Sequence, residues 1–235
     1  MRNALQKGAW WVADYAFVAY WQCRAIFGRA RVNDYRSGQK RPVLVIPGVW
    51  ERWSFMLPLV RAAHSAGHPV FVVTALGGNR APVDESAQTV AAFIQANDLE
   101  DVLIVAHSKG GLIGKYVMAY RDERCRITGM VAVSTPFNGS NYARFLMLPS
   151  LRAFSPDDPT VRRLAASREV NPRIVSVYAQ FDPHIPGGSG LLGAQNIELP
   201  TGGHFRILAK PQTFEIVRER ASAPPSADWA ARRVE

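Results

Sequence analysis

Short runs of β-branched and other apolar residues recur along this chain, separated by segments with helical spacing. The runs cover residues 43–46, 70–73, 102–105, 130–133 and 174–177, with a weaker run at 196–199. The segments 83–94 and 112–120 instead repeat their apolar residues every three or four positions, which is the spacing of one helix face. Strands that alternate with helices predict an α/β fold, a mostly parallel sheet of about six strands with helices on both faces.

The first 41 residues depart from this pattern, because residues 7–24 are strongly aromatic. On a helix they form two neighbouring stripes: Trp10, Asp14, Phe17 and Trp21 on one, and Trp11, Tyr15 and Val18 on the other. Because such a helix is apolar on most sides, either the rest of the protein or a membrane must cover it. It either packs across the body of the protein with Asp14 paired to an arginine, or lies in a membrane interface through its Trp, Tyr and Arg side chains.

The same segment is a poor candidate for a membrane span or a secretory signal. It is shorter than the roughly 20 apolar residues that cross a bilayer. Arginines follow it, and no small-residue cleavage site does. We therefore expect a cytoplasmic protein or one that contacts a membrane peripherally through this helix.

Length and composition predict one folded domain. The chain has 235 residues, 48% of them hydrophobic, which is enough for a sizeable core. We place an aromatic helix and basic linker at residues 1–41, the α/β domain at 42–220 and a flexible tail at 221–235. Within the domain, residues 137–170 form an insertion that either caps the active site or packs on the sheet, and periodicity favours neither.

Charge and cysteine content narrow the function classes. The net charge of +9 would suit nucleic acid, but the basic residues are scattered and match no nucleic-acid module, so we predict no nucleic-acid partner. The two cysteines, Cys23 and Cys125, form neither a disulfide framework nor a zinc motif, and we predict no metal. Nothing in the sequence indicates an oligomeric state.

The strand run at 102–105 leads into Ala106, His107, Ser108, Lys109 and Gly110, after which the helical spacing begins. A serine between a strand and a helix, flanked two residues away by small residues, is typical of a nucleophile elbow. We therefore predict Ser108 as the nucleophile.

A second copy of the small-His-Ser-x-Gly pattern, at residues 63–67, serves as a control. It is centred on Ser65 and follows a helical run, before Gly67 and Pro69. That context predicts the end of a helix for Ser65, because the elbow works only between strand and helix.

A serine needs a base in hydrogen-bond reach and an acid that orients the base. Asp182 follows the run at 174–177, and His204 follows the weak run at 196–199 in a glycine-containing loop. The order Ser, Asp, His is that of α/β-hydrolases. We predict Asp182 as the acid and His204 as the base.

Four other histidines compete for the role of base. His64 and His68 flank a predicted helix end, and His107 precedes the nucleophile and is expected to pack beneath it. His184 is the rival, but it stands two residues after Asp182, too close for that carboxylate to orient it above Ser108.

The oxyanion formed in acyl transfer needs two backbone N–H donors. One is expected from Lys109, directly after the nucleophile, and the other from Val49 in the Pro-Gly loop after the first strand. The cationic side chain of Lys109 opposes the dipole at a helix start, and we expect it to be solvated.

These residues resemble the α/β-hydrolase superfamily, and in particular its compact bacterial serine lipases and esterases whose elbow begins with Ala. The resemblance covers roughly residues 42–210. Residues 45–49 are similar to the oxyanion loop, with Pro47 in place of His, and residues 134–140 resemble a Thr-Pro-His-x-Gly-Ser stretch, with Phe137 in the His position. The loops that carry Asp182 and His204 resemble the acid and histidine loops of the family.

The resemblance implies hydrolysis of carboxylic esters through an acyl-enzyme on Ser108, with no cofactor and with a small-molecule or lipid ester as substrate. We expect the acyl groove to be lined by aromatic residues, namely Trp50, Trp53, Phe55, Phe137 and the segment 145–154 that begins at Phe145. An acyltransferase or thioesterase on the same triad, or a non-catalytic membrane-associated module of this fold, remains open.

Overall fold

The computed structural model of the chain describes residues 2–145, 154–225 and 229. Its centre is a six-stranded sheet of order β2-β1-β3-β4-β5-β6, in which every neighbouring pair is parallel. The strands are β1 Val43–Ile46, β2 Val70–Val72, β3 Val102–His107, β4 Ile127–Val133, β5 Ile174–Phe181 and β6 Gln195–Gly202. The apolar runs in the sequence predicted all six, and the parallel sheet is confirmed.

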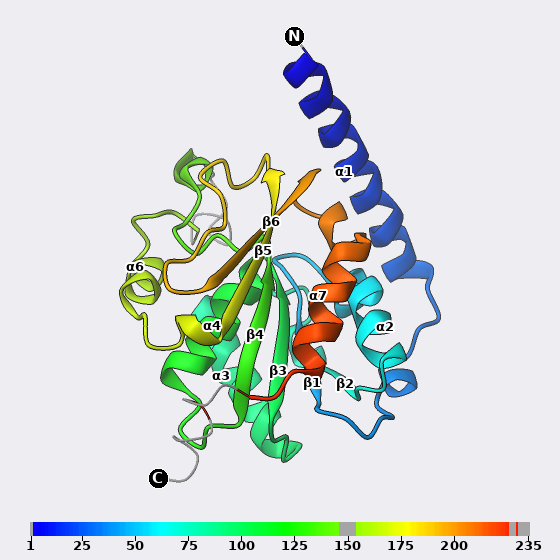
Figure 1. Cartoon of the computed structure of the whole chain (residues 1–235), viewed down its shortest axis with the longest axis vertical. Coiled ribbons are helices and arrows are strands. Elements are labelled where there is room, and N and C mark those ends of the chain that lie inside the picture. The colour runs from blue at the N-terminus through cyan, green and yellow to red at the C-terminus, as the bar shows by residue number, and fades with distance from the viewer. Residues whose placement is uncertain (1, 146–153, 226–228, 230–235) are drawn as a thin grey trace.

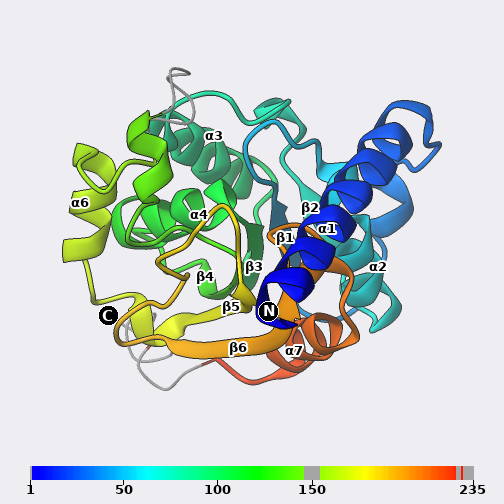
Figure 2. The same cartoon turned by 90° about the horizontal axis from the view of Figure 1, so that it is seen from above.

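Helices cover both faces of this sheet (Figures 1 and 2). Helices α1 Arg2–Phe27, α2 Leu57–Ser65 and α7 Pro211–Ser222 pack with one hydrophobic cluster, and α3 Val83–Ala96, α4 Lys109–Tyr120 and α6 Pro159–Ala166 with the other. The short 3-10 helices are η1 Val32–Tyr35, η2 Trp53–Met56, η3 Thr74–Leu76, η4 Asn141–Phe145, η5 Asn171–Arg173 and η6 Arg206–Ala209.

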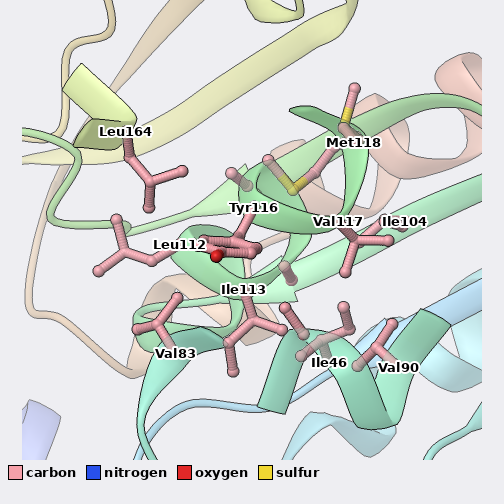
Figure 3. Packing of buried hydrophobic residues seen from close by; sticks show 14 of the residues in the cluster. Ile46, Val83, Val90, Ile104, Leu112, Ile113, Tyr116, Val117, Met118 and Leu164 are labelled. Carbon is pink, nitrogen blue, oxygen red and sulfur yellow. The ribbon is translucent and has the colours of Figure 1, made fainter. Parts of the chain in front are cut away.

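Side chains along each strand alternate between the two faces of the sheet, which explains why helices must cover both faces. In β1, Leu44 and Ile46 join the α3/α4 cluster, whereas Val43 and Val45 join the α2/α7 cluster. Successive side chains of a strand point to opposite faces, so a strand that is apolar at every position must be buried on both. Figure 3 shows the α3/α4 side, where Ile46 and Ile104 of the sheet meet the apolar face of α4.

Several strands run further toward their carboxyl ends than the apolar runs predicted. Strand β3 continues to His107 and therefore ends at the residue before Ser108, and β5 continues to Phe181, directly before Asp182. The carboxyl ends of parallel strands meet at one edge of the sheet, where sites in open α/β sheets form. The candidate residues are thus gathered at that edge.

Helix α1 lies across this edge, close to β6, η2 and η6 (Figure 2). The stripe of Trp10, Asp14, Phe17 and Trp21 is the more covered one, with Asp14 and Trp21 buried, whereas Trp11 and Tyr15 of the neighbouring stripe are exposed. No helix in the described residues has the length and apolarity that a bilayer crossing requires.

The insertion at 137–170 is described in part. Helix α6 packs against α4, and its Val161 and Leu164 belong to the hydrophobic core. Residues 146–153, in the middle of the predicted cap, lie outside the described residues. Helix α7 ends at Ser222, just past the predicted start of the tail, and most of that tail also lies outside them.

Candidate active site

Ser108 occupies a sharp turn between β3 and α4. Its backbone has φ 50° and ψ −120°, a conformation that side chains rarely adopt, and its N–H donates to the Val133 carbonyl at 2.9 Å. The turn brings α4 so close to β1 that a Cβ at Gly110 would lie 2.2 Å from the Ile46 carbonyl oxygen. Glycine at this position is therefore a steric requirement. Ser65, the control copy, lies at the end of α2 as predicted.

Three side chains from separate loops form a hydrogen-bonded line. His204 Nε2 lies 3.0 Å from Ser108 Oγ, and His204 Nδ1 lies 2.7 Å from Asp182 Oδ2. A carboxylate only accepts, so Nδ1 carries the proton toward Asp182 and Nε2 is left with a lone pair for the serine hydroxyl. The Ser108 hydroxyl can therefore donate to His204 Nε2 while His204 Nδ1 donates to Asp182, as a serine nucleophile and its base require.

Charge and burial tune both titratable members of this line. Burial raises the pKa of Asp182, but the charge and hydrogen bond of His204, together with the His184 N–H, outweigh it and hold that pKa below its usual value. Burial lowers the pKa of His204, and the Asp182 carboxylate outweighs this, so the pKa of His204 lies above its usual value. The two groups thus stabilise each other's charged form.

His184, the rival base, lies beside the line rather than in it. Its ring centroid is 4.9 Å from that of His204, and its Nε2 is 3.3 Å from the Tyr15 hydroxyl. Its backbone N–H donates to Asp182 Oδ1 at 2.8 Å. Burial, followed by the charge of His204, lowers the pKa of His184 to about 4, so this ring is neutral at physiological pH.

The two predicted oxyanion donors come from different segments of the chain, the loop after β1 and the residue directly after Ser108. Val49 and Ser108 line the same cavity, and Lys109 begins α4. On either side of Val49, the N–H of Gly48 donates to Glu51 and that of Trp50 to the Gly78 carbonyl. Within the described part of the chain, neither Val49 nor Lys109 has an acceptor for its own N–H. Both remain available to a ligand.

The prediction of a solvated Lys109 side chain is wrong. This side chain is 1% exposed, and its Nζ donates to the Asn79 carbonyl at 2.9 Å and to the Ala81 carbonyl. The loop before α3 thus supplies the oxygen atoms that water would otherwise provide. Burial lowers the pKa of Lys109 to about 8.

Glu51 was not predicted as part of the site. It is 3% exposed, its Oε1 lies 2.9 Å from His107 Nδ1, and its Oε2 accepts the Gly48 N–H at 2.7 Å. His107, packed beneath the elbow as expected, has its Nε2 3.1 Å from the His204 carbonyl oxygen. A buried acid near a buried histidine links the Val49 loop to the His204 loop. The one sequence signal was a glutamate three residues after the Pro-Gly turn.

Asp14 has a different partner from the arginine predicted for it. Its Oδ2 accepts the backbone N–H of His204 at 2.8 Å, and its Oδ1 accepts those of Phe205 at 2.9 Å and Arg206 at 2.8 Å. The carboxylate is fully buried. An interior polar residue in an aromatic helix was visible in the sequence, but its partner was not, because the partner is backbone from a distant loop.

A cavity of about 360 Å³ opens above Ser108 and His204. Its walls are mostly aromatic and aliphatic, contributed by residues that include Trp11, Tyr15, Trp50, Tyr142, Phe154 and Phe205. A volume and lining of this kind are typical of small-molecule sites. Helix α1, through Trp11 and Tyr15, supplies a wall that the sequence did not predict.

The predicted substrate-contacting residues are placed differently. Trp50 lines the cavity, whereas Phe137 is 1% exposed and packs in the core, where its ring lies 5.9 Å from Lys115 Nζ. Trp53 and Phe55 pack in the cluster on the α2 side. The side chain of Phe145 lies outside the described residues. Among the described residues, no three His, Cys, Asp or Glu side chains are grouped as a metal site would require.

Neither the models of known protein families nor the curated protein sequences contain a match to this chain. Solved structures do match it. A lipase from Bacillus licheniformis in its mature form has a TM-score of 0.64 at 14% identity, over 78% of this chain and 93% of that one. Lipase B of Aspergillus fumigatus has a TM-score of 0.65 at 16% identity, over 84% and 56% of the two chains.

A monoacylglycerol lipase of Paleococcus ferrophilus has a TM-score of 0.58 at 16% identity, over 79% of this chain and 96% of that one. Identities this low make the likeness one of fold. The parallel sheet, the strand-to-helix turn at Ser108 and this likeness show that the chain has the α/β-hydrolase fold.

Proposed function

We propose that this protein is a serine hydrolase that cleaves carboxylic esters through an acyl-enzyme on Ser108. The observation that carries the proposal is the hydrogen-bonded line of Asp182, His204 and Ser108, in which His204 and Ser108 line an apolar cavity. A fold alone does not imply an activity, whereas a nucleophile, a base and an orienting acid in contact supply the chemistry of acyl transfer.

In the first half of the reaction, Ser108 Oγ attacks the ester carbonyl carbon while His204 Nε2 takes the hydroxyl proton. Negative charge moves to the carbonyl oxygen, and the N–H groups of Val49 and Lys109 are the donors available to it. The tetrahedral intermediate collapses, the bond to the alkoxy oxygen breaks, and His204 returns its proton to the leaving alcohol. The product is the acyl ester of Ser108.

Water completes the cycle by the reverse route. His204 takes a proton from the water as it attacks the acyl carbon, and the proton then passes to Ser108 Oγ when the carboxylic acid leaves. Asp182 stays ionised throughout and stabilises the imidazolium that forms twice in each turnover, in agreement with its lowered pKa.

The cavity favours an apolar acyl group. Its walls offer aromatic and aliphatic surface, and among the described residues no lysine or arginine side chain lines it. Burial of acyl carbons against such walls contributes about 0.8 kcal/mol per methylene. The lipases among the structural neighbours are consistent with esters of this kind.

The test is intact-mass analysis after treatment with a fluorophosphonate, which phosphonylates activated serines. We expect a single adduct on the wild-type protein and on Ser65→Ala, and no adduct on Ser108→Ala. Hydrolysis of p-nitrophenyl esters should disappear in the same variant. Folded wild-type protein that takes up no probe, with and without detergent, would contradict the proposal.

A further inference from the structure

Three consecutive backbone N–H groups of the His204 loop converge on one carboxylate of helix α1. The donors are His204, Phe205 and Arg206, and the distances to the Asp14 oxygens lie between 2.8 and 2.9 Å. Successive N–H groups that point to one side form a concave anion site. Here a side chain that precedes the loop by 190 residues occupies it.

The helix and the loop approach closely because the loop carries two glycines at the point of contact. A Cβ at Gly202 would lie 2.3 Å from Cε3 of Trp10, and a Cβ at Gly203 would lie 2.4 Å from Asp14 Oδ1. Gly203 also has φ +114°, which other residues rarely adopt. The loop that holds His204 is therefore shaped around this part of α1.

A buried carboxylate is costly unless it is fully hydrogen-bonded. An apolar residue at position 14 would cover the sheet edge at no such cost, and it would leave three loop N–H groups without acceptors. Asp14 instead fixes the backbone N–H of His204, the residue whose ring bonds to Ser108. Small displacements of a base reduce rates strongly, by about 100-fold for 1 Å.

We propose that Asp14 is a positioning residue for His204, so that docking of helix α1 completes the active site. This inference rests on the proposed function, because it assigns Asp14 a role in the orientation of the base. The same helix contributes the Trp11 and Tyr15 wall of the cavity, so positioning of the base and formation of the acyl site depend on one element.

The negative charge of Asp14 also affects the pKa of the His204 imidazole. Charged or titratable groups approach His204 from several elements: Asp182 and His184 after β5, Glu51 after β1, His107 at the end of β3, and Asp14 on α1. Asp182 raises the pKa of His204 most, and Glu51 and Asp14 raise it further. Removal of the Asp14 charge should therefore move the acidic limb of the rate profile to lower pH.

The variant Asp14→Asn keeps the shape of the side chain and removes its charge. One amide NH₂ must then face a backbone N–H, so the loop loses at least one acceptor. We expect kcat to fall by about 10- to 100-fold, with KM nearly unchanged, and the acidic limb to shift downward. The control Asp34→Asn makes the same chemical change on the exposed η1 and should leave both readouts at wild-type values. Wild-type kcat and pH profile in folded Asp14→Asn would overturn the proposal.

Gly202→Ala provides a second route if Asp14→Asn does not fold. It keeps Asp14 but places a methyl group against the Trp10 ring, so the Trp10 side chain, or helix α1 with it, must shift. We expect a similar fall in kcat together with faster exchange of the amides of residues 204–206, and faster exchange with wild-type kcat would overturn the proposal.

Hydrogen exchange separates this inference from the proposed function. Exchange of the amides of residues 204–206 should be slow in the wild type and at least about tenfold faster in Asp14→Asn, whether or not Ser108 reacts with a fluorophosphonate. Equal exchange would refute the positioning role, whereas an unlabelled Ser108 in a protein with slow wild-type exchange would refute only the hydrolase.

Discussion

The Glu51 carboxylate and the His107 imidazole form a buried pair beneath the nucleophile elbow, with Oε1 and Nδ1 2.9 Å apart. The pair joins two loops that belong to the site. Glu51 accepts the Gly48 N–H next to the predicted oxyanion donor Val49, and His107 Nε2 lies 3.1 Å from the carbonyl oxygen of His204. It thereby couples the position of the oxyanion loop to that of the base.

Glu51→Ala should lower the free energy of unfolding by about 3 kcal/mol, because it leaves a buried imidazole and the Gly48 N–H without their acceptor. The matched control is Glu215→Ala, whose carboxylate is 72% exposed and 3.4 Å from Arg218, and whose loss should cost less than about 0.5 kcal/mol. Chemical denaturation of both variants gives the comparison. A loss below about 1 kcal/mol for Glu51→Ala would show that the pair contributes little.

Trp11→Ala should shift the preference of the enzyme toward longer acyl chains. The indole lines the cavity from α1, and its removal gives additional methylene groups room to bury. We expect the ratio of kcat/KM for octanoyl over butyryl p-nitrophenyl esters to rise about tenfold. Tyr20→Ala on the same helix is the control, since Tyr20 is 56% exposed and is not among the residues that line the cavity. Equal ratios in the two variants would place the acyl chain elsewhere.

The pH dependence of kcat/KM should follow His204. The base acts only when neutral, and its pKa is raised above the usual 6.5. Activity should therefore rise with pH through a midpoint above 6.5. The contribution of this raised pKa to folding stability changes with pH in the opposite direction to activity. It is fully present below pH 6.5 and is lost as the pH rises through the pKa of His204 in the folded protein.

Asp182→Asn removes the main cause of this raised pKa. The midpoint should fall, and kcat should drop on the order of 10⁴-fold because the tautomer of His204 is no longer held. Rate profiles of the two proteins between pH 5 and 9 provide the measurement. A midpoint that does not move would mean that another group limits the acidic limb.

Lys115→Met should stabilise the protein at pH 7. The Lys115 ammonium is buried, its Nζ has no hydrogen-bond partner within the described residues, and burial lowers its pKa to about 8. Methionine keeps the length of the chain without this cost, so the free energy of unfolding should rise by about 1–3 kcal/mol. Lys40→Met, at an exposed position, should change it by less than about 0.5 kcal/mol.

The same variant has a signature in alkaline solution. Between about pH 8 and 10.5 the unfolded chain binds more protons at Lys115 than the folded one, so wild-type stability gains a contribution with rising pH in this window. Lys115→Met should lack that contribution. An identical alkaline slope in both proteins would mean that the ammonium is hydrated in the folded state.

Local patterns were sufficient for the sheet and for the elbow. A run of β-branched residues buries both faces of a strand wherever it lies, and the small residues at 106 and 110 mark a strand-to-helix turn that can be recognised from its immediate sequence. The order of Ser108, Asp182 and His204 along the chain could likewise be predicted, because each follows its own strand and parallel strands end at one edge.

Partners that come from distant segments were decided by the tertiary structure alone. Periodicity identified the stripe of α1 that carries Asp14, but not that the stripe meets the backbone of residues 204–206. Lys109 was expected in water because only the folded loop at residues 79–81 brings carbonyl oxygens to it. Helical or strand spacing determines which face of an element is buried, whereas packing of whole elements determines which polar groups a buried side chain meets.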